Sequence, residues 1–241
     1  MDKRPPHARA APAPRAVLFD AYGTLFDVYS VGLLAEQLFP GSGERLAQAW
    51  RDKQIEYTRL ASMSGAGGAH YLPFWELTRA GLRYTAARLG LGLDAGREER
   101  LMNQYRHLSA FPENREVLAA LKAGGVRAGV LSNGDPEMLG VAVRSAGFGE
   151  LLDPVLSVHE TRRYKTDPAA YALGTRALDL PAAEVLFVSS NGWDALGATW
   201  FGYRTLWVNR FGLPPEQIGP APTRVGTSLR DVLSFFDLRT S

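Results

Sequence analysis

Four short apolar runs constrain the fold of this chain more than any other feature. None of them alternates apolar with polar side chains, which is typical of strands that are buried on both faces. Segments with a helical pattern precede the later runs, at residues 113–123, 168–178 and 193–201. Strands that alternate with helices build βαβ units around a parallel sheet. We therefore predict an α/β fold, a doubly wound Rossmann-like parallel sheet with strands at residues 16–19, 128–131, 185–188 and 205–208.

Residues 30–108 interrupt this alternation. They contain long amphipathic stretches at 44–60, 71–89 and 97–108, a glycine-rich break at 64–68 and no convincing strand. Stretches of that length and pattern favour helices. We predict an all-helical cap domain at about 30–108, inserted into an α/β core domain made of residues 16–29 and 109–241.

The composition excludes several classes of protein. The 241 residues include no cysteine, which rules out disulfides, thiolate metal sites and a cysteine nucleophile. No run of about 18 apolar residues occurs, so we expect no membrane span. The formal net charge is +2, and four basic residues against one acidic residue lie within residues 1–15. The rest of the chain is nearly neutral and gives no reason to expect a nucleic-acid partner.

Residues 1–15 are rich in proline and alanine and lack the apolar stretch of a secretory signal. We predict that they form a disordered leader. The absence of cysteine is compatible with the cytoplasm, and we expect the protein to be cytoplasmic.

Small polar and acidic residues follow the predicted strands. They occupy residues 20–24, 132–135 and 189–194, and Lys165 lies just before a predicted helix. Ligands of open parallel sheets bind outside the carboxyl ends of the strands. If these segments converge there, they bring together two carboxylates, an ammonium group and several hydroxyl and amide groups. Such a set offers a nucleophile, a charge partner and orienting groups.

Four motifs in these segments resemble the haloacid dehalogenase superfamily, and specifically its L-2-haloacid dehalogenases. They occur in the family's order, and the resemblance extends from about residue 16 to the C-terminal region. In this sequence the motifs are Phe19–Asp27 (FDAYGTLFD), Leu131–Gly134 (LSNG), Tyr164–Lys165 (YK) and Phe187–Asp194 (FVSSNGWD).

Two features favour the dehalogenases over the phosphatases of the superfamily. The phosphatases carry a second aspartate as acid/base two residues after the first, and Tyr22 stands at that position here. In the last motif Asp194 is the only acid, and a magnesium ion prefers several carboxylate or other oxygen ligands. The resemblance therefore implies a reaction without a metal ion and without an organic cofactor. Residues 50–57 also resemble the dehalogenase cap helix, in which an arginine, here Arg51, meets the leaving halide.

The resemblance implies a two-step hydrolysis of short-chain L-2-haloalkanoic acids. The Asp20 carboxylate would attack C2, expel halide and form an aspartyl ester with inversion, and water would then attack the side-chain carbonyl carbon of Asp20. The product would be a D-2-hydroxyacid. The catalytic positions carried over are Asp20, Thr24, Arg51, Ser132, Asn133, Lys165, Ser189, Asn191 and Asp194.

Within this set the resemblance gives each residue a role. Thr24 and Lys165 would hold Asp20 and neutralise its charge. Asp194 would act as the base or position the water. Its helpers in that step would be Lys165, Ser189 and Asn191.

The halide and the substrate would contact other residues. Arg51 would stabilise the charge on the departing halide, with Asn133 and Trp193 as lesser partners. Ser132 and backbone amides near Tyr22 would hold the substrate carboxylate. The substrate-binding candidates are Ala21, Tyr22, Ile55, Phe74, Ser132, Asn133, Tyr171 and Trp193, of which Tyr22, Ile55, Phe74 and Trp193 would form the apolar pocket. The expected partners are this haloacid and the halide, and relatives lead us to expect a homodimer.

Two other functions stay open on the sequence alone. One is a magnesium-dependent phosphatase of the same superfamily, against which Tyr22 argues. The other is a non-catalytic anion-binding module, against which Asp20 argues because a carboxylate repels anions.

Structural roles are also open for several of these residues. Ser132 and Asn133 are residue types that cap helices, and Asp194 is another. Arg51 and Lys165 are residue types found mostly in surface positions, and Ile55 and Phe74 in cores.

Overall fold

The computed structural model describes residues 13–64 and 68–239. Its centre is a six-stranded, all-parallel sheet with the strand order β3-β2-β1-β4-β5-β6. The predicted parallel α/β core is confirmed. The strands are β1 (Ala16–Phe19), β2 (Arg127–Ser132), β3 (Val155–Ser157), β4 (Val185–Ser189), β5 (Arg204–Val208) and β6 (Arg224–Gly226).

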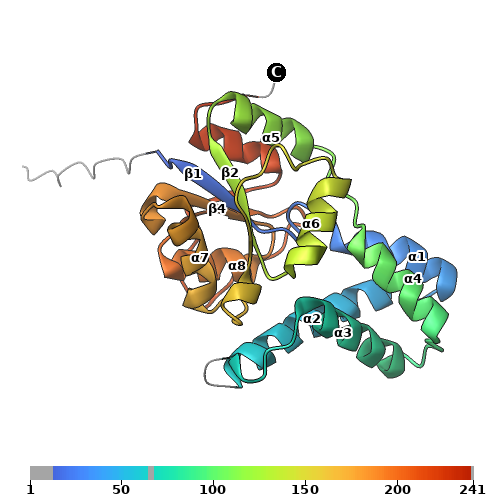
Figure 1. Cartoon of the computed structure of the whole chain (residues 1–241). Helices are drawn as coiled ribbons and strands as arrows, with labels where there is room; N and C mark the ends of the chain where they lie inside the picture. The colour runs from blue at the N-terminus through green and yellow to red at the C-terminus, as the bar shows by residue number, and fades with distance from the viewer. Residues whose placement is uncertain (1–12, 65–67, 240–241) are drawn as a thin grey trace, which may run out of the picture.

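Helices cover both faces of this sheet. Figure 1 shows α7 (Pro168–Leu178) and α8 (Gly192–Phe201) on one face, and α5 (Asn114–Ala123) with the 3₁₀ segment Leu229–Phe235 on the other. The helix α6 (Pro136–Ser145) joins β2 to β3. Strands β1 and β4 are wholly buried at the centre, which explains why their sequences are apolar without alternation.

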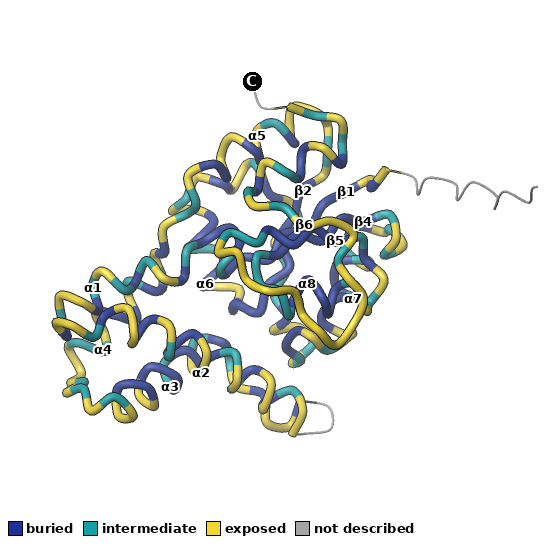
Figure 2. The backbone as a smooth tube through the Cα atoms, turned by 180° about the vertical axis from the view of Figure 1, so that it is seen from behind, coloured by how far each residue is buried: buried dark blue, intermediate teal, exposed yellow. Residues whose placement is uncertain are grey.

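In the described part of the chain, the cap consists of four α-helices between β1 and α5. They are α1 (Val31–Leu38), α2 (Gly43–Met63), α3 (Phe74–Arg88) and α4 (Ala95–Arg106). Figure 1 shows them as a separate layer beside the sheet, and Figure 2 shows buried stretches along these helices. The expected helical insertion is therefore present, and its exact domain boundaries stay a prediction.

Two expectations concern residues at the edge of what the structure describes. Most of the expected leader, residues 1–12, and residues 65–67 of the glycine-rich break lie outside the described residues. Within the described part, Arg15 pairs with Glu184 at 2.9 Å, which anchors the entry to β1. No helix among residues 13–64 and 68–239 is long and apolar enough to span a membrane.

Candidate active site

Asp20 stands at the carboxyl end of β1. Its backbone N–H donates to the carbonyl of Val188 at 2.9 Å, so the pairing of β1 with β4 continues to this residue. Its side chain is only 7% exposed. Because ligands bind at this edge of a parallel sheet, the carboxylate stands where a bound substrate would be reached.

Three side chains donate to the Asp20 carboxylate. Lys165 Nζ lies 3.0 Å from Oδ1, while Thr24 Oγ1 at 3.0 Å and Asn191 Nδ2 at 2.8 Å bind Oδ2. The Thr24 hydroxyl also accepts from the Ser190 backbone N–H at 2.8 Å. The donors come from three different loops, so the carboxylate has a single fixed orientation.

Lys165 joins this carboxylate to a second one. Its ammonium lies 2.9 Å from Asp194 Oδ2, and the lysine side chain is completely buried. Asp194 belongs to the first turn of α8 and accepts from the Tyr171 hydroxyl at 2.7 Å. Burial raises the pKa of Asp194 to about 6; Lys165 opposes this shift and the nearby Asp20 charge adds to it. A carboxylate with such a pKa is ionised at neutral pH and suited to accept a proton.

The polar loops hold this arrangement through short contacts. Asn133 Oδ1 accepts from the Lys165 backbone N–H at 3.0 Å. Ser132 Oγ accepts from Gly134 N at 3.0 Å, and Ser189 Oγ accepts from Asn191 N at 3.1 Å. These bonds position the loops and leave the hydroxyl protons of the two serines available as donors.

Helix capping, the alternative role considered for Ser132, Asn133 and Asp194, does not match the structure. Asp135 is the N-cap of α6 and Asn191 is the N-cap of α8. Ser132 and Asn133 therefore do not cap the following helix, and Asp194 is a buried partner of Lys165.

Arg51 reaches the same place from the cap. It comes from the middle of α2 and is 7% exposed, so a surface role is ruled out. Its Nη2 donates to the carbonyl of Tyr22 at 2.9 Å and to Asn191 Oδ1 at 3.3 Å. The neighbouring Asp52 is exposed and leaves Arg51 to these partners.

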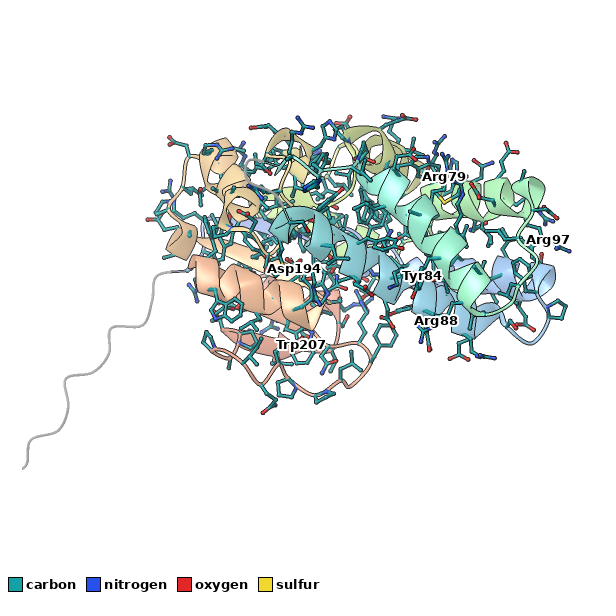
Figure 3. The ribbon with its side chains drawn as sticks, turned by 90° about the horizontal axis from the view of Figure 1, so that it is seen from below. Arg79, Tyr84, Arg88, Arg97, Asp194 and Trp207 are labelled. Carbon is teal, nitrogen blue, oxygen red and sulfur yellow. The ribbon has the colours of Figure 1, made fainter. Side chains whose placement is uncertain are left out.

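A cleft of about 550 Å³ opens between the core and the cap at this point. Arg51, Ile55, Asn191 and Trp193 are among the residues that line it. Figure 3 shows Asp194 where the core meets the cap helices and Arg97 at the far end of the cap.

The other residues predicted to bind the substrate lie behind the residues that line the cleft. The Tyr22 ring packs on Phe74 with ring centroids 5.5 Å apart, and Phe74 is 1% exposed. Ala21 and Tyr171 are completely buried, the latter behind Asp194. Phe74 thus packs against Tyr22 and Tyr171 bonds Asp194, and none of these four residues lines the cleft itself.

Some polar residues of this region escaped the sequence analysis. Gln54 is completely buried and accepts from Arg51 Nη1 at 2.7 Å and from the Tyr105 hydroxyl at 3.0 Å. Its position three residues after Arg51, on the same face of a helix, is the signal that could have identified it. Asp135 also crosses from core to cap, where it accepts from the backbone N–H groups of Phe74 and Trp75.

The side chains of the site provide few ligands for a metal ion. No group of three or more histidine, aspartate or glutamate side chains that could hold a metal gathers within residues 13–64 and 68–239. The two carboxylates of the site share one ammonium, which lies within 3.0 Å of both. A cation between them would have to displace Lys165, so these residues do not fit a magnesium site.

The similarity to known proteins identifies the family. Residues 14–202 match the family model described as haloacid dehalogenase-like hydrolase. An (S)-2-haloacid dehalogenase of Pseudomonas sp. (strain YL) is 41% identical over 223 residues, which are 92% of this chain and 94% of the relative. The chain belongs to the haloacid dehalogenase-like hydrolases.

Solved structures narrow the position of this hydrolase within the family. The crystal structure of an L-2-haloacid dehalogenase is 57% identical, covers 94% of this chain and 100% of its own, and superposes with a TM-score of 0.92. The L-2-haloacid dehalogenase of Xanthobacter autotrophicus with chloropropionic acid covalently bound is 37% identical, with coverages of 91% and 96% and a TM-score of 0.84. The resemblance to the L-2-haloacid dehalogenases that the motifs predict is confirmed.

Proposed function

We propose that this protein hydrolyses short-chain L-2-haloalkanoic acids to D-2-hydroxyacids through an ester on Asp20. One observation carries the proposal. The amide of Asn191 donates to Asp20 Oδ2 at 2.8 Å and accepts from Arg51 Nη2 at 3.3 Å. A single side chain therefore links a buried carboxylate to a guanidinium at the edge of the cleft, which pairs a nucleophile with a site for a departing anion.

The first step forms the ester. An oxygen of Asp20 attacks C2 of the substrate from the side opposite the halogen, and the electron pair of the carbon–halogen bond leaves with the halide. The configuration at C2 inverts. Arg51 stabilises the charge that develops on the halide, assisted by Asn133 and Trp193, because preformed donors act where charge appears in the transition state.

The second step hydrolyses the ester. Water attacks the side-chain carbonyl carbon of Asp20 and gives a proton to Asp194. The ester bond to the hydroxyacid breaks and the departing oxygen receives that proton. Asp20 regains its carboxylate by releasing the second proton of the water to solvent. Lys165, which bonds both carboxylates, stabilises the negative charge that moves between them.

The substrate itself is held at both ends. Ser132 and the backbone amides of Ala21 and Tyr22 receive its carboxylate, a role that suits the free hydroxyl proton of Ser132. Ile55 and Trp193, which line the cleft, surround its alkyl part together with Tyr22, and Phe74 packs behind Tyr22.

Halide release from the two enantiomers of 2-chloropropionate tests this function. The L enantiomer should release chloride and yield D-lactate, with the same rate in the presence of EDTA. A single turnover with excess enzyme in ¹⁸O-labelled water should place the label in Asp20 before any appears in lactate. Label that enters lactate directly would contradict the ester, and phosphate release from small esters would favour the phosphatase.

We also propose that the protein is a cytoplasmic homodimer. A chain without cysteine does not depend on an oxidising compartment for disulfides.

A second, largely apolar cleft of about 750 Å³ supports the dimer and lies where α1 and α2 meet the loop after β5. Its exposed residues Leu33, Phe211 and Leu213 are suited to contact with a second copy. Light scattering after size-exclusion chromatography should give twice the mass of 26.3 kDa.

A further inference from the structure

Gln54 lies at the centre of a buried polar network within the cap. The network contains Arg51, Gln54, Thr78 and Tyr105, and Gln54 and Thr78 have no exposed surface. Aromatic rings enclose it, since Tyr105 lies 5.2 Å from Trp50 and 5.9 Å from Tyr22 between ring centroids. Hydrogen bonds are strong in such surroundings, and an unpaired member is costly.

The donor and the acceptor of each hydrogen bond in this network can be assigned. The Thr78 hydroxyl donates to the carbonyl of Phe74 at 2.7 Å, so its oxygen is left to accept. It accepts from Gln54 Nε2 at 2.6 Å. This contact determines which end of the amide is oxygen, and Gln54 Oε1 therefore faces Arg51 and Tyr105.

The result is a guanidinium held from two sides. Gln54 binds Nη1 at 2.7 Å from the cap, while the Tyr22 carbonyl binds Nη2 at 2.9 Å from the core. A guanidinium has five N–H groups, so donors beyond these bonds and the one to Asn191 remain for an anion. Arg51 lines the cleft, where that anion would lie.

We propose that Gln54 is a positioning residue that aims Arg51 at the departing halide. This inference rests on the proposed function. Gln54 has no exposed surface and does not line the cleft, so it acts through its bond to Arg51, in the step that breaks the carbon–halogen bond. It matters most for chloride, because chloride is a poorer leaving group than bromide and depends more on stabilisation of its charge.

The decisive experiment compares two steps and two halides. Gln54→Met keeps the length of the side chain and removes its polar atoms. Single turnovers with L-2-chloropropionate should show carbon–chlorine cleavage slowed about 10- to 100-fold, the usual scale for one preorganised contact. Cleavage of L-2-bromopropionate should slow less, and decay of the ester, followed by mass spectrometry, should stay within about two-fold of the wild type.

Matched variants separate aiming from general support of the fold. Thr78→Val removes the oxygen that orients Gln54 and should shift the chloride-to-bromide ratio in the same direction, whereas Thr78→Ser should restore it. Thr85→Val is the control, because Thr85 is also buried in α3 and its hydroxyl donates to the Ala49 carbonyl at 3.3 Å, outside the network. It should lower the melting temperature and leave the ratio unchanged.

Each outcome decides the inference. A folded Gln54→Met with the wild-type ratio, or one that slows both chemical steps equally, overturns it. If Gln54→Met does not fold, Thr78→Val and Tyr105→Phe give the same comparison. If the wild type releases no halide, the proposed function fails, and calorimetric titration with bromide then decides: weaker binding to Gln54→Met supports the inference and equal binding rejects it.

Discussion

Two carboxylates share one ammonium in this site, and their surroundings differ. Asp20 accepts three side-chain hydrogen bonds and stands at the end of a strand next to the cleft. Asp194 is completely buried behind it and bonds Lys165 and Tyr171. Pairs of titratable groups in unlike environments divide the roles of a reaction between them. The strand end, where ligands of a parallel sheet bind, suits the nucleophile, and the position in α8 behind it suits the base.

Replacing the nucleophile should stop the reaction at its first step. Asp20→Asn keeps the shape and most of the hydrogen bonds but removes the attacking charge, so halide release should fall by about 10⁴-fold or more. Ion chromatography measures the halide, and circular dichroism verifies the fold. The mass of the variant must be checked, because deamidation would restore aspartate. Turnover by protein of the unchanged Asn mass would refute the role of Asp20.

With Asp194 as the proposed base, its pKa sets the pH dependence that we expect for ester hydrolysis. Burial raises this pKa to about 6 while Asp20 is charged. In the ester Asp20 carries no charge, so one of the causes of the upward shift is removed and the pKa of Asp194 lies lower. The base is then ionised at neutral pH, and protonation switches it off as the pH falls.

Single-turnover decay of the ester should therefore be independent of pH above about 6 and should fall at lower pH. Asp194→Asn should slow this decay more than ester formation, so that the adduct accumulates and is seen by mass spectrometry. A rate that continues to rise between pH 7 and pH 9 would assign the base to another group. Tyr171→Phe is a matched control, since it keeps the carboxylate and removes one hydrogen bond.

At the scale of elements, the close packing of α8 brings Asp194 to Lys165. A Cβ at Gly197, one turn after Asp194, would lie 2.6 Å from the Tyr171 hydroxyl and 2.5 Å from Thr166 Cγ2. Gly197→Ala should therefore push α8 away, lower stability by about 1–3 kcal/mol and slow ester hydrolysis. Gly140→Ala in α6 is the control, because its Cβ would meet only the flexible end of Arg144. Equal activity of the two variants would show that α8 has room to move.

A second contact between elements, made of hydrogen bonds from Asp135, joins the core to the cap. Asp135 occupies the N-cap position of α6 without a side-chain bond to that helix. Its side chain instead accepts from Phe74 N at 3.0 Å and Trp75 N at 2.7 Å, at the start of α3. Asp135→Ala should lower stability by about 1–2 kcal/mol, as the loss of a helix cap does, and should also raise KM because the cap is less firmly seated on the core. Asp94→Ala removes the corresponding bond at α4, within the cap. It should cost similar stability without changing KM, and a parallel change in KM would argue against the connection.

The elements that the sequence predicts best are the ones whose side chains are most buried. The strands β1, β2, β4 and β5 lie within a residue of their predicted bounds, and α7 matches its prediction fully. The strands β3 and β6 were missed, because they are three-residue edge strands with partly exposed side chains and no apolar run. The helix α1 was also missed, since it is short and has no side-chain cap at its start.

At the scale of the whole molecule, the site is an assembly of two parts that are distant in the sequence. Motifs predicted its core half, because loops after parallel strands must meet at one edge. They could not predict that Asn191 links Asp20 to Arg51, nor that Gln54 supports that arginine. Such bonds depend on how the cap lies on the core. A local sequence pattern carries no information about the distance between the cap and the core.

The same assembly predicts a reaction that does not need a metal ion. Lys165 already lies between Asp20 and Asp194, at 3.0 Å and 2.9 Å, and Tyr22 stands where phosphatases of the superfamily carry an acid. Protein dialysed against EDTA should therefore release chloride from L-2-chloropropionate at the rate of untreated protein, and added magnesium should not change it. A magnesium-dependent phosphatase of the same superfamily, treated in parallel, should lose its activity and thereby verify that the chelation worked. Loss of chloride release on chelation, restored by magnesium, would mean that the cation displaces Lys165 during the reaction and that this ammonium has a different role from the one its two ion pairs indicate.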